Sequence, residues 1–137
     1  MPYETFDHTA DLGLRIWAAD LNQLFADAAR GLFSLILPNL DSIEPRETVT
    51  FSFAGEVSEL LLFDWLNELL YTFEVQHLIL SEFEVQVGPT GLQAVARGEP
   101  LDRQRHQLDH EVKAITYHGL KLEQQPNGWL AEVIVDI

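Results

Sequence analysis

The sequence predicts an α+β fold, in which two helices pack on a mainly antiparallel β-sheet within a single compact domain spanning residues 1–137. Two segments repeat apolar residues at helical spacing, and much of the remaining chain alternates apolar and polar residues as half-buried strands do. A length of 137 residues suits one domain, and no repeat, low-complexity stretch or linker divides it.

The N-terminal part of the chain is expected to form a strand, a loop, a second strand and the start of a helix. Tyr3–Phe6 is short and β-prone, the loop Asp7–Gly13 interrupts it, and Leu14–Ala18 resumes as a strand. Asp20 then has the character of a helix N-cap, and Gln23 follows three residues later as in a capping box.

The middle of the chain is predicted as helix, loop, strand and helix. The first helix is amphipathic and ends before Pro38, and a polar loop, Asn39–Arg46, follows. Glu47–Gly55 alternates cleanly and is predicted as a half-buried strand. Gly55–Ser58 leads into a second helix, which should be largely buried against the sheet because its apolar stripe is wide. The residues of this stripe are Leu62, Trp65, Leu66, Leu69 and Phe73, widened by Leu61, Phe63 and Leu70.

The rest of the chain is predicted as strands joined by turns with a clear local cause. Glycine and proline mark two hairpin turns, at Gly88–Gly91 and Pro126–Gly128. The polar segment Leu101–Asp109 lies between the two hairpins. The expected strands are Leu78–Val87, Leu92–Arg97, His110–Leu120, Leu120–Gln124 and Trp129–Ile137.

Composition excludes several classes of protein. The chain has no cysteine, which excludes disulfides, thiol catalysis and cysteine-ligated metals. No apolar run approaches the ~20 residues that span a membrane, and no signal peptide is visible, so we expect a cytoplasmic protein with no membrane association.

Charge is the most unusual property of the composition. Twenty-two acidic residues against eight basic ones give a net charge of −14. A nucleic-acid-binding protein is expected to carry a basic patch, whereas the only lysines here are Lys113 and Lys121, so direct nucleic-acid binding is not expected. An acidic surface suits a cation or a basic protein partner. The alternative, that acidity simply keeps the protein soluble, remains open at this point.

The N-terminal loop is the first candidate site. Asp7, His8, Thr9 and Asp11 place two carboxylates, an imidazole and a hydroxyl within five residues. Such oxygen ligands suit a hard cation, but aspartate and threonine are also common turn formers. An EF-hand is excluded, because the twelfth position counted from Asp7 is Ala18 rather than glutamate.

The C-terminal strand ends abruptly at Asp136 and Ile137. Side chains alternate along a strand, so the Ile137 side chain can pack in the core while Asp136 faces the Asp7–Asp11 loop. We therefore expect the two ends of the chain to meet and to form an oxygen-rich cation site.

Other catalytic or metal chemistry finds little support. His106 and His110 lack the glutamate of the metalloprotease motif, and His118 would lie about 26 Å from His110 on a straight strand. There is no glycine-framed serine and no phosphate-binding glycine loop. Lys113 is unusual between apolar residues in a lysine-poor chain, although a lysine also protects an edge strand from aggregation.

Three segments together resemble the signatures of the archease family, and the resemblance spans essentially the whole chain. Leu12 and Val135 depart from the residues usual in that family, both by apolar exchanges. The segments are Asp7-His8-Thr9-Ala10-Asp11-Leu12-Gly13, Glu111-Val112-Lys113-Ala114-Ile115-Thr116-Tyr117-His118, and Gly128–Ile137.

The resemblance implies a small α+β protein that is not itself an enzyme. Archeases are cofactors of the RtcB-type RNA ligase in tRNA splicing, and they promote the metal- and GTP-dependent guanylylation of the ligase and its multiple turnover. Some members are linked instead to a tRNA methyltransferase, for which they act as chaperones. A stand-alone metal-dependent enzyme that uses the same carboxylates remains the alternative from a different class.

The resemblance also assigns roles to individual residues. It implies that Asp11, Asp136 and the C-terminal Ile137 bind a divalent cation, calcium first, with Mg²⁺ or Mn²⁺ as alternatives. Asp7, His8 and Thr9 would support these ligands from the neighbouring loop. Lys113 matches a lysine that is needed to activate the partner.

Overall fold

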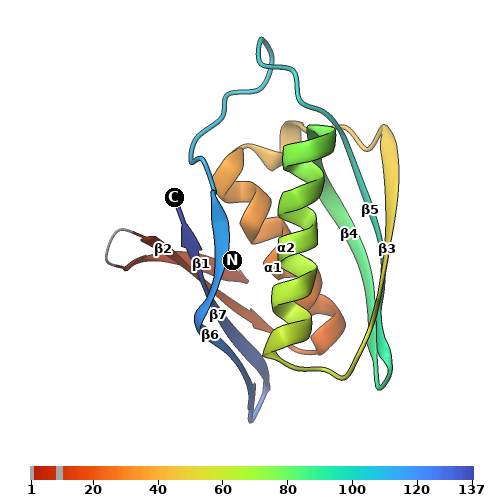
Figure 1. Cartoon of the computed structure of the whole chain (residues 1–137), viewed down its shortest axis with the longest axis vertical. Helices are drawn as coiled ribbons and strands as arrows, with labels where there is room; N and C mark the ends of the chain where they lie inside the picture. Colours follow the sequence, from red (N-terminus) through yellow and green to blue (C-terminus); the bar gives the residue numbers. More distant parts are fainter. Residues whose placement is uncertain (1, 9–10) are drawn as a thin grey trace.

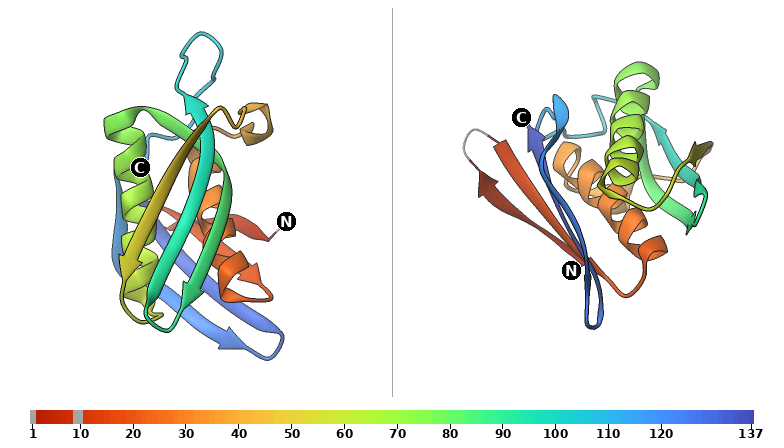
Figure 2. Two further views of the ribbon diagram at one scale, coloured as in Figure 1. Left: turned by 90° about the vertical axis from the view of Figure 1, so that its right-hand side faces the viewer. Right: turned by 60° about the horizontal axis from the view of Figure 1, so that its bottom comes forward.

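The computed structural model describes residues 2–8 and 11–137, with the backbone alone for residues 7 and 8. Two helices lie between two antiparallel sheets, so the prediction of helices packed on antiparallel β-structure is confirmed (Figure 2). The elements are β1 (Tyr3–His8), β2 (Asp11–Ala18), α1 (Leu21–Ile36), the 3-10 helix η1 (Leu40–Ser42), β3 (Glu47–Ala54), α2 (Glu59–Gln76), β4 (Leu78–Gly88), β5 (Gly91–Pro100), β6 (Ala114–Gln125) and β7 (Gly128–Asp136).

The strands are divided into two sheets rather than the one expected. One sheet has the order β1-β2-β7-β6 and the other the order β3-β5-β4. Both helices lie between them, as Figure 1 and Figure 2 show. The reason is that α1 is buried on most of its circumference and packs on β2 in one sheet and on β4 in the other. A helix with so wide an apolar surface needs a layer on each side.

Both helices begin at the caps that their sequences provide. The Asp20 carboxylate accepts a hydrogen bond from the Gln23 N–H at 2.8 Å, and the Ser58 hydroxyl accepts one from the Leu61 N–H at 3.2 Å. The first helix ends at Ile36, before Pro38, as predicted. The second ends at Gln76, and the next residue, His77, caps it in the left-handed conformation with φ of 55°.

Trp65 is the centre of the core and joins three elements. Its indole is fully buried, and the Nε1–H donates a hydrogen bond to the Phe25 carbonyl of α1 at 2.9 Å. Its ring meets Phe51 of β3 and Phe83 of β4 edge to face, with centroids 5.4 and 6.4 Å apart.

Two expectations about the strands were wrong. Most of the Asp7–Gly13 segment is strand rather than loop, because Asp7 pairs with Leu12 and His8 with Asp11 in the antiparallel pairing of β1 and β2. The His110–Leu120 strand begins only at Ala114. The reason for the second is that the N–H groups of Asp109 and His110 donate to the last carbonyls of α1, those of Ile36 and Leu35. The residues before Ala114 are therefore not part of the strand.

Among the described residues, none of the helices is long and apolar enough to cross a membrane.

Candidate functional site

The two ends of the chain meet at one end of the four-stranded sheet. The antiparallel register of β2 and β7 places Asp11 directly opposite Asp136. Opposed residues of antiparallel strands project from the same face, with Cβ atoms typically ~4.5–5.5 Å apart. Figure 1 shows the C-terminus beside the β1–β2 hairpin. The expectation that the ends of the chain meet is confirmed.

The aspartate pair lies on the face of the sheet that points away from the helices. Leu14 and Ile16 of β2, opposite Val133 and Ala131 of β7, are buried against the core. Asp11 and Asp136 occupy the alternate positions, so their side chains project from the opposite face. Asp136 is accordingly exposed.

Ile137 combines an apolar anchor with a charged end. Its side chain is partly buried and packs against the core, as the alternation of side chains predicts. Its main-chain carboxylate follows Asp136 by a single residue. Ile137 therefore lies at the same end of the sheet as the aspartate pair.

Lys113 joins this end of the sheet from the other side of β7. Its side chain is exposed, and its backbone N–H donates a hydrogen bond to the Asp136 carbonyl at 2.7 Å. It lies immediately before β6, whose first residue, Ala114, also pairs with Asp136. Asp136 is therefore flanked by Asp11 on one strand and by the Lys113–Ala114 segment on the other.

The structure describes only part of Asp7, His8 and Thr9, the residues expected to support the cation ligands. The backbone of Asp7 pairs with Leu12 and that of His8 with Asp11. The side chains of Asp7 and His8, and all of Thr9, lie outside the described part of the structure. Gly13 is required for a different reason, since a Cβ atom there would overlap the Phe6 ring of β1.

A second ion-pair group occupies the same face of the sheet. Arg15 of β2 donates to Glu132 of β7 at 2.7 Å and to Glu4 of β1 at 2.8 Å. These hydrogen bonds, that to Glu132 first, raise the pKa of Arg15 above its ordinary value. Arg15 also lies over the Phe6 ring, 4.6 Å from its centroid. The Arg15 guanidinium therefore forms ion pairs with Glu4 and Glu132.

The donor set at the end of the sheet fits a hard divalent cation. It consists of carboxylate oxygens, which are the ligands that calcium, magnesium and manganese prefer. No group of three or more His, Cys, Asp or Glu side chains in the described ranges is placed to hold a metal ion. The third anionic ligand that the family resemblance implies is the main-chain carboxylate of Ile137, and its binding of a cation stays a prediction.

A groove of about 610 Å³ lies next to Lys113, between the end of α2 and the segment that leads to β6. Apolar and charged side chains share its lining, among them Phe73, Glu74, His77, Leu108, Glu111 and Lys113. Lys113 thus lies between this groove and the aspartate pair.

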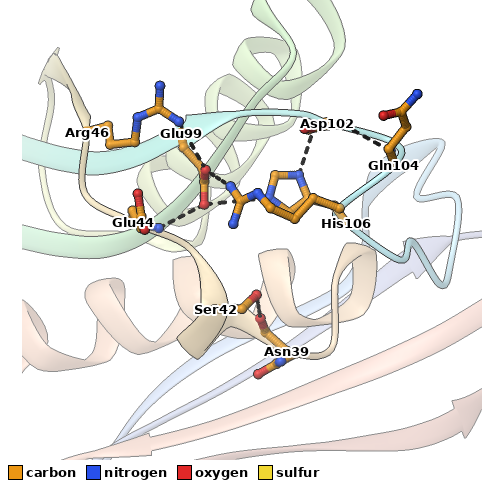
Figure 3. A network of polar contacts seen from close by, with 9 residues as sticks. Asn39, Ser42, Glu44, Arg46, Glu99, Asp102, Gln104 and His106 are labelled. Atoms are coloured by element: carbon orange, nitrogen blue, oxygen red, sulfur yellow. Dashed lines mark hydrogen bonds and ion pairs between the residues drawn. The ribbon is translucent and has the colours of Figure 1, made fainter.

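A buried charge network surrounds Glu99, at the end of β5, and no sequence pattern indicated it (Figure 3). Glu99 is fully buried and accepts a hydrogen bond from the Glu44 N–H at 2.9 Å. It forms ion pairs with Arg105 and, at 3.6 Å, with Arg46. Nothing in the local pattern separates this glutamate from an exposed one, because its partners lie on other segments.

His106 belongs to the same network, and its burial disfavours the charged form of the ring. Its Nδ1 accepts a hydrogen bond from the Asp102 N–H at 2.9 Å, so the proton of the neutral ring lies on Nε2. That Nε2 is buried without a hydrogen bond, 3.5 Å from the Glu99 carboxylate. Burial, followed by the charge of Arg105, lowers the pKa of His106, and Asp102 partly offsets this.

This geometry predicts a loss of stability in acid. Because the folded pKa of His106 is below its unfolded value of about 6.5, folding favours the neutral ring. The contribution is fully present above that pH and is lost as the pH falls through it toward the folded pKa. Thermal melts between pH 7.5 and 5.5 should show a steeper decline for the wild type than for His106→Gln. His118→Gln, at an exposed position of β6, should keep the wild-type slope, and equal slopes for all three proteins would contradict the assignment.

The chain is similar to known proteins over its full length. Residues 3–137 match the model of the archease protein family (MTH1598/TM1083). The protein archease of Methanopyrus kandleri is 41% identical over 141 residues, covering 100% of both chains. The protein archease of Pyrococcus abyssi is 39% identical over 140 residues, covering 98% of both chains.

Solved structures agree with the fold. The solution structure of Methanobacterium thermoautotrophicum protein 1598 superimposes with a TM-score of 0.88 at 30% identity, covering 99% of both chains. The crystal structure of an archease, possible chaperone, from Thermotoga maritima gives a TM-score of 0.68 at 20% identity, covering 98% of this chain and 96% of that one, and at that identity it supports the fold alone. Taken with the family match over residues 3–137, these likenesses establish that the chain belongs to the archease family.

Proposed function

We propose that this protein is an accessory factor that activates an RtcB-type RNA ligase in tRNA splicing or RNA repair. It would promote the metal- and GTP-dependent guanylylation of the ligase and its multiple turnover, without being an enzyme itself. The observation that supports the proposal is that Asp11 lies opposite Asp136, whose carbonyl accepts the Lys113 N–H, in a chain that belongs to the archease family.

Asp11, Asp136 and the main-chain carboxylate of Ile137 would hold a divalent cation at this end of the sheet. Converging carboxylates repel each other by roughly 1–4 kcal/mol per pair at ~4 Å, depending on the effective dielectric. A bound cation, calcium first and Mg²⁺ or Mn²⁺ as alternatives, would offset this repulsion. The three residues would thereby be fixed beside Lys113.

Charge supports a protein partner rather than RNA. With a net charge of −14, the surface repels phosphate, so we propose that the protein contacts the ligase and makes no tight contact with tRNA of its own. Lys113 is the exception, because its exposed ammonium group can reach phosphate as a compact point charge. Its target in the complex would be the nucleotide or active site of the ligase.

A chaperone of a tRNA methyltransferase is the second candidate. Membership of the archease family favours it, because some members are linked to such an enzyme. Both candidates need a surface that binds another protein, and they differ in the partner. A stand-alone metal-dependent enzyme built on the same carboxylates is the third.

The test is a guanylylation assay with a purified RtcB-type ligase, GTP and Mn²⁺. Adding this protein should increase the rate of guanylylation and allow repeated ligation by each ligase molecule. The protein alone should turn over neither GTP nor RNA, and in filter binding at ~0.1 M salt it should not retain tRNA at submicromolar concentration. Turnover by the isolated protein would favour the enzyme alternative, and stimulation of a methyltransferase but not of the ligase would favour the chaperone.

The cation site makes a separate prediction about the C-terminus. Extending the chain beyond Ile137 converts the terminal carboxylate into an uncharged amide, so a C-terminal tag should weaken calcium binding about as much as Asp136→Asn does. Isothermal titration of calcium into each protein measures this, and calcium should raise the melting temperature of the wild type.

The same tag placed before Met1 is the control, because it leaves Ile137 as the last residue. It should bind calcium with wild-type affinity. Equal affinities for the two tagged proteins would remove the terminal carboxylate from the site, and no binding by either would remove the site itself.

A further inference from the structure

The outward side of α2 carries large apolar side chains that the fold does not cover. Leu60 is 54% exposed, and Tyr71 and Val75 are each 55% exposed. Their spacing corresponds to whole turns of the helix, so the three lie on one side of it. Single exposed apolar residues are ordinary, but three aligned on one helix form a patch.

The core does not need these residues. The opposite side of α2 is already occupied by Leu62, Trp65 and Leu69, each fully buried. The expectation that this helix would be largely buried holds for its apolar stripe, and the outward side is the part that stays exposed. The reason is that α2 fills the opening between the edge strands β6 and β3 and has no third layer beyond it (Figure 1).

The apolar surface continues from α2 onto β6. Tyr117 of β6 is 52% exposed, and its ring meets Phe63 of α2 edge to face, with centroids 5.5 Å apart. Leu60, Tyr71, Val75 and Tyr117 together are the α2 face. They account for all but one of the large hydrophobic residues exposed in the described part of the chain, the other being Trp17.

The charged residues of α2 itself have a single sign. The helix contains no lysine or arginine, and neither does any position between Arg46 and Arg97. The acidic residues of the helix are Glu59, Asp64, Glu68 and Glu74. A second copy of this chain would bring acid against acid, and RNA or an anionic membrane surface would be repelled as well.

We propose that the α2 face is the surface on which the ligase docks, covering Leu60, Tyr71, Val75 and Tyr117 with apolar side chains that are flanked by lysine or arginine. The proposal rests on the proposed function, since an enzyme that binds RNA presents basic surface. The acidic rim steers the two proteins together, and the aromatic centre holds them. The bound ligase then lies along α2, whose final residues Phe73 and Glu74 line the groove that contains Lys113.

The test measures the affinity of this protein for a purified RtcB-type ligase by isothermal titration. L60S/Y71S removes two of the four apolar side chains of the α2 face and should weaken binding by at least about tenfold, as loss of a tyrosine anchor typically does. Trp17→Ser is the matched control, because Trp17 is 42% exposed on the four-stranded sheet and lies outside the α2 face. The melting temperatures of both variants are also measured. That of L60S/Y71S should equal the wild-type value, because the lost side chains are exposed.

A second pair of variants tests the charge of the rim. Asp64→Lys should weaken binding and reduce its dependence on salt, whereas Glu82→Lys, at an exposed position of β4, should have a smaller effect on both. These variants keep the apolar centre, so they remain informative whatever L60S/Y71S does to stability.

The outcomes separate this proposal from the proposed function. If the wild type activates the ligase and L60S/Y71S binds it equally well, the α2 face is not the docking surface. The proposed function is then unaffected. A wild type that neither binds nor activates the ligase overturns both. Wild-type dimers in sedimentation that L60S/Y71S dissociates would make a second copy the occupant and overturn the proposal.

Discussion

Replacing Glu99 by alanine should lower the free energy of unfolding by about 3 kcal/mol. Removing one partner of a buried ion pair typically costs about 3–5 kcal/mol, because the other charge is left without compensation. Here the lower end of that range applies, since Arg105 and Arg46 are 43% and 61% exposed and can turn toward water. The Glu44 N–H would lose its acceptor as well. Denaturant unfolding followed by circular dichroism measures the change.

Two further variants separate charge from shape in this effect. The Glu44 N–H and Arg105 donate to different oxygens of Glu99, and Glu99→Gln keeps one of these acceptors, so it should cost less than alanine. Glu84→Ala breaks the exposed pair of Glu84 with Arg97, and exposed pairs contribute only about 0–1 kcal/mol. If Glu99→Ala were as mild as Glu84→Ala, the network would have no structural importance.

The position of the Glu99 network suggests why a costly arrangement of buried charge is present. It ties the loop after η1 and the end of β5 to the polar segment 101–110. That segment continues to Lys113, and its Asp109 and His110 N–H groups bond the end of α1. The network therefore anchors the connection that delivers Lys113 to Asp136. Loosening Glu99 should also reduce the activation of the ligase at temperatures where the variant is still folded.

The helices and hairpin turns could be predicted because their causes are local. Asp20 caps the start of the first helix, and the helix cannot continue through Pro38. The turns at Gly91 and Gly128 need glycine, since φ is 156° and 150° there. Each of these features depends on residues that are neighbours in the sequence.

The features that could not be predicted depend on residues far apart in the sequence. The division of the strands into two sheets follows from the burial of α1 on both sides, which periodicity shows only as a wide stripe. The late start of β6 follows from hydrogen bonds to the end of α1, and the Glu99 network joins three separate segments. A local sequence pattern does not show whether a polar group will pair with a distant segment or with water.

The candidate site depends on both local and long-range features, so it could be predicted only in part. Strand alternation predicted that Asp136 and the Ile137 side chain diverge, and the structure agrees. The register that brings Asp11 opposite Asp136 is a long-range property, and the sequence indicated it only through the motifs at the two ends. Cation binding by these residues stays a prediction.

Replacing Lys113 by alanine should abolish activation of the ligase and leave the protein otherwise intact. The side chain is exposed, and its structural contact is made by the backbone N–H, which alanine retains. Stability and calcium affinity should therefore be unchanged, as melting curves and calorimetry would show. Activation should fail because the compact ammonium charge can no longer reach phosphate in the partner.

Lys121 provides the matched control, because it is the only other lysine in the chain. It lies on β6, 3.4 Å from Glu123 in a half-exposed ion pair, where its loss should cost little. Lys121→Ala should activate the ligase as the wild type does, and Lys113→Arg should restore part of the activity, since it keeps the charge but changes its shape. If Lys113→Ala stimulates guanylylation normally, Lys113 protects the edge of the sheet instead, and the activating group must be sought among the carboxylates around Asp136.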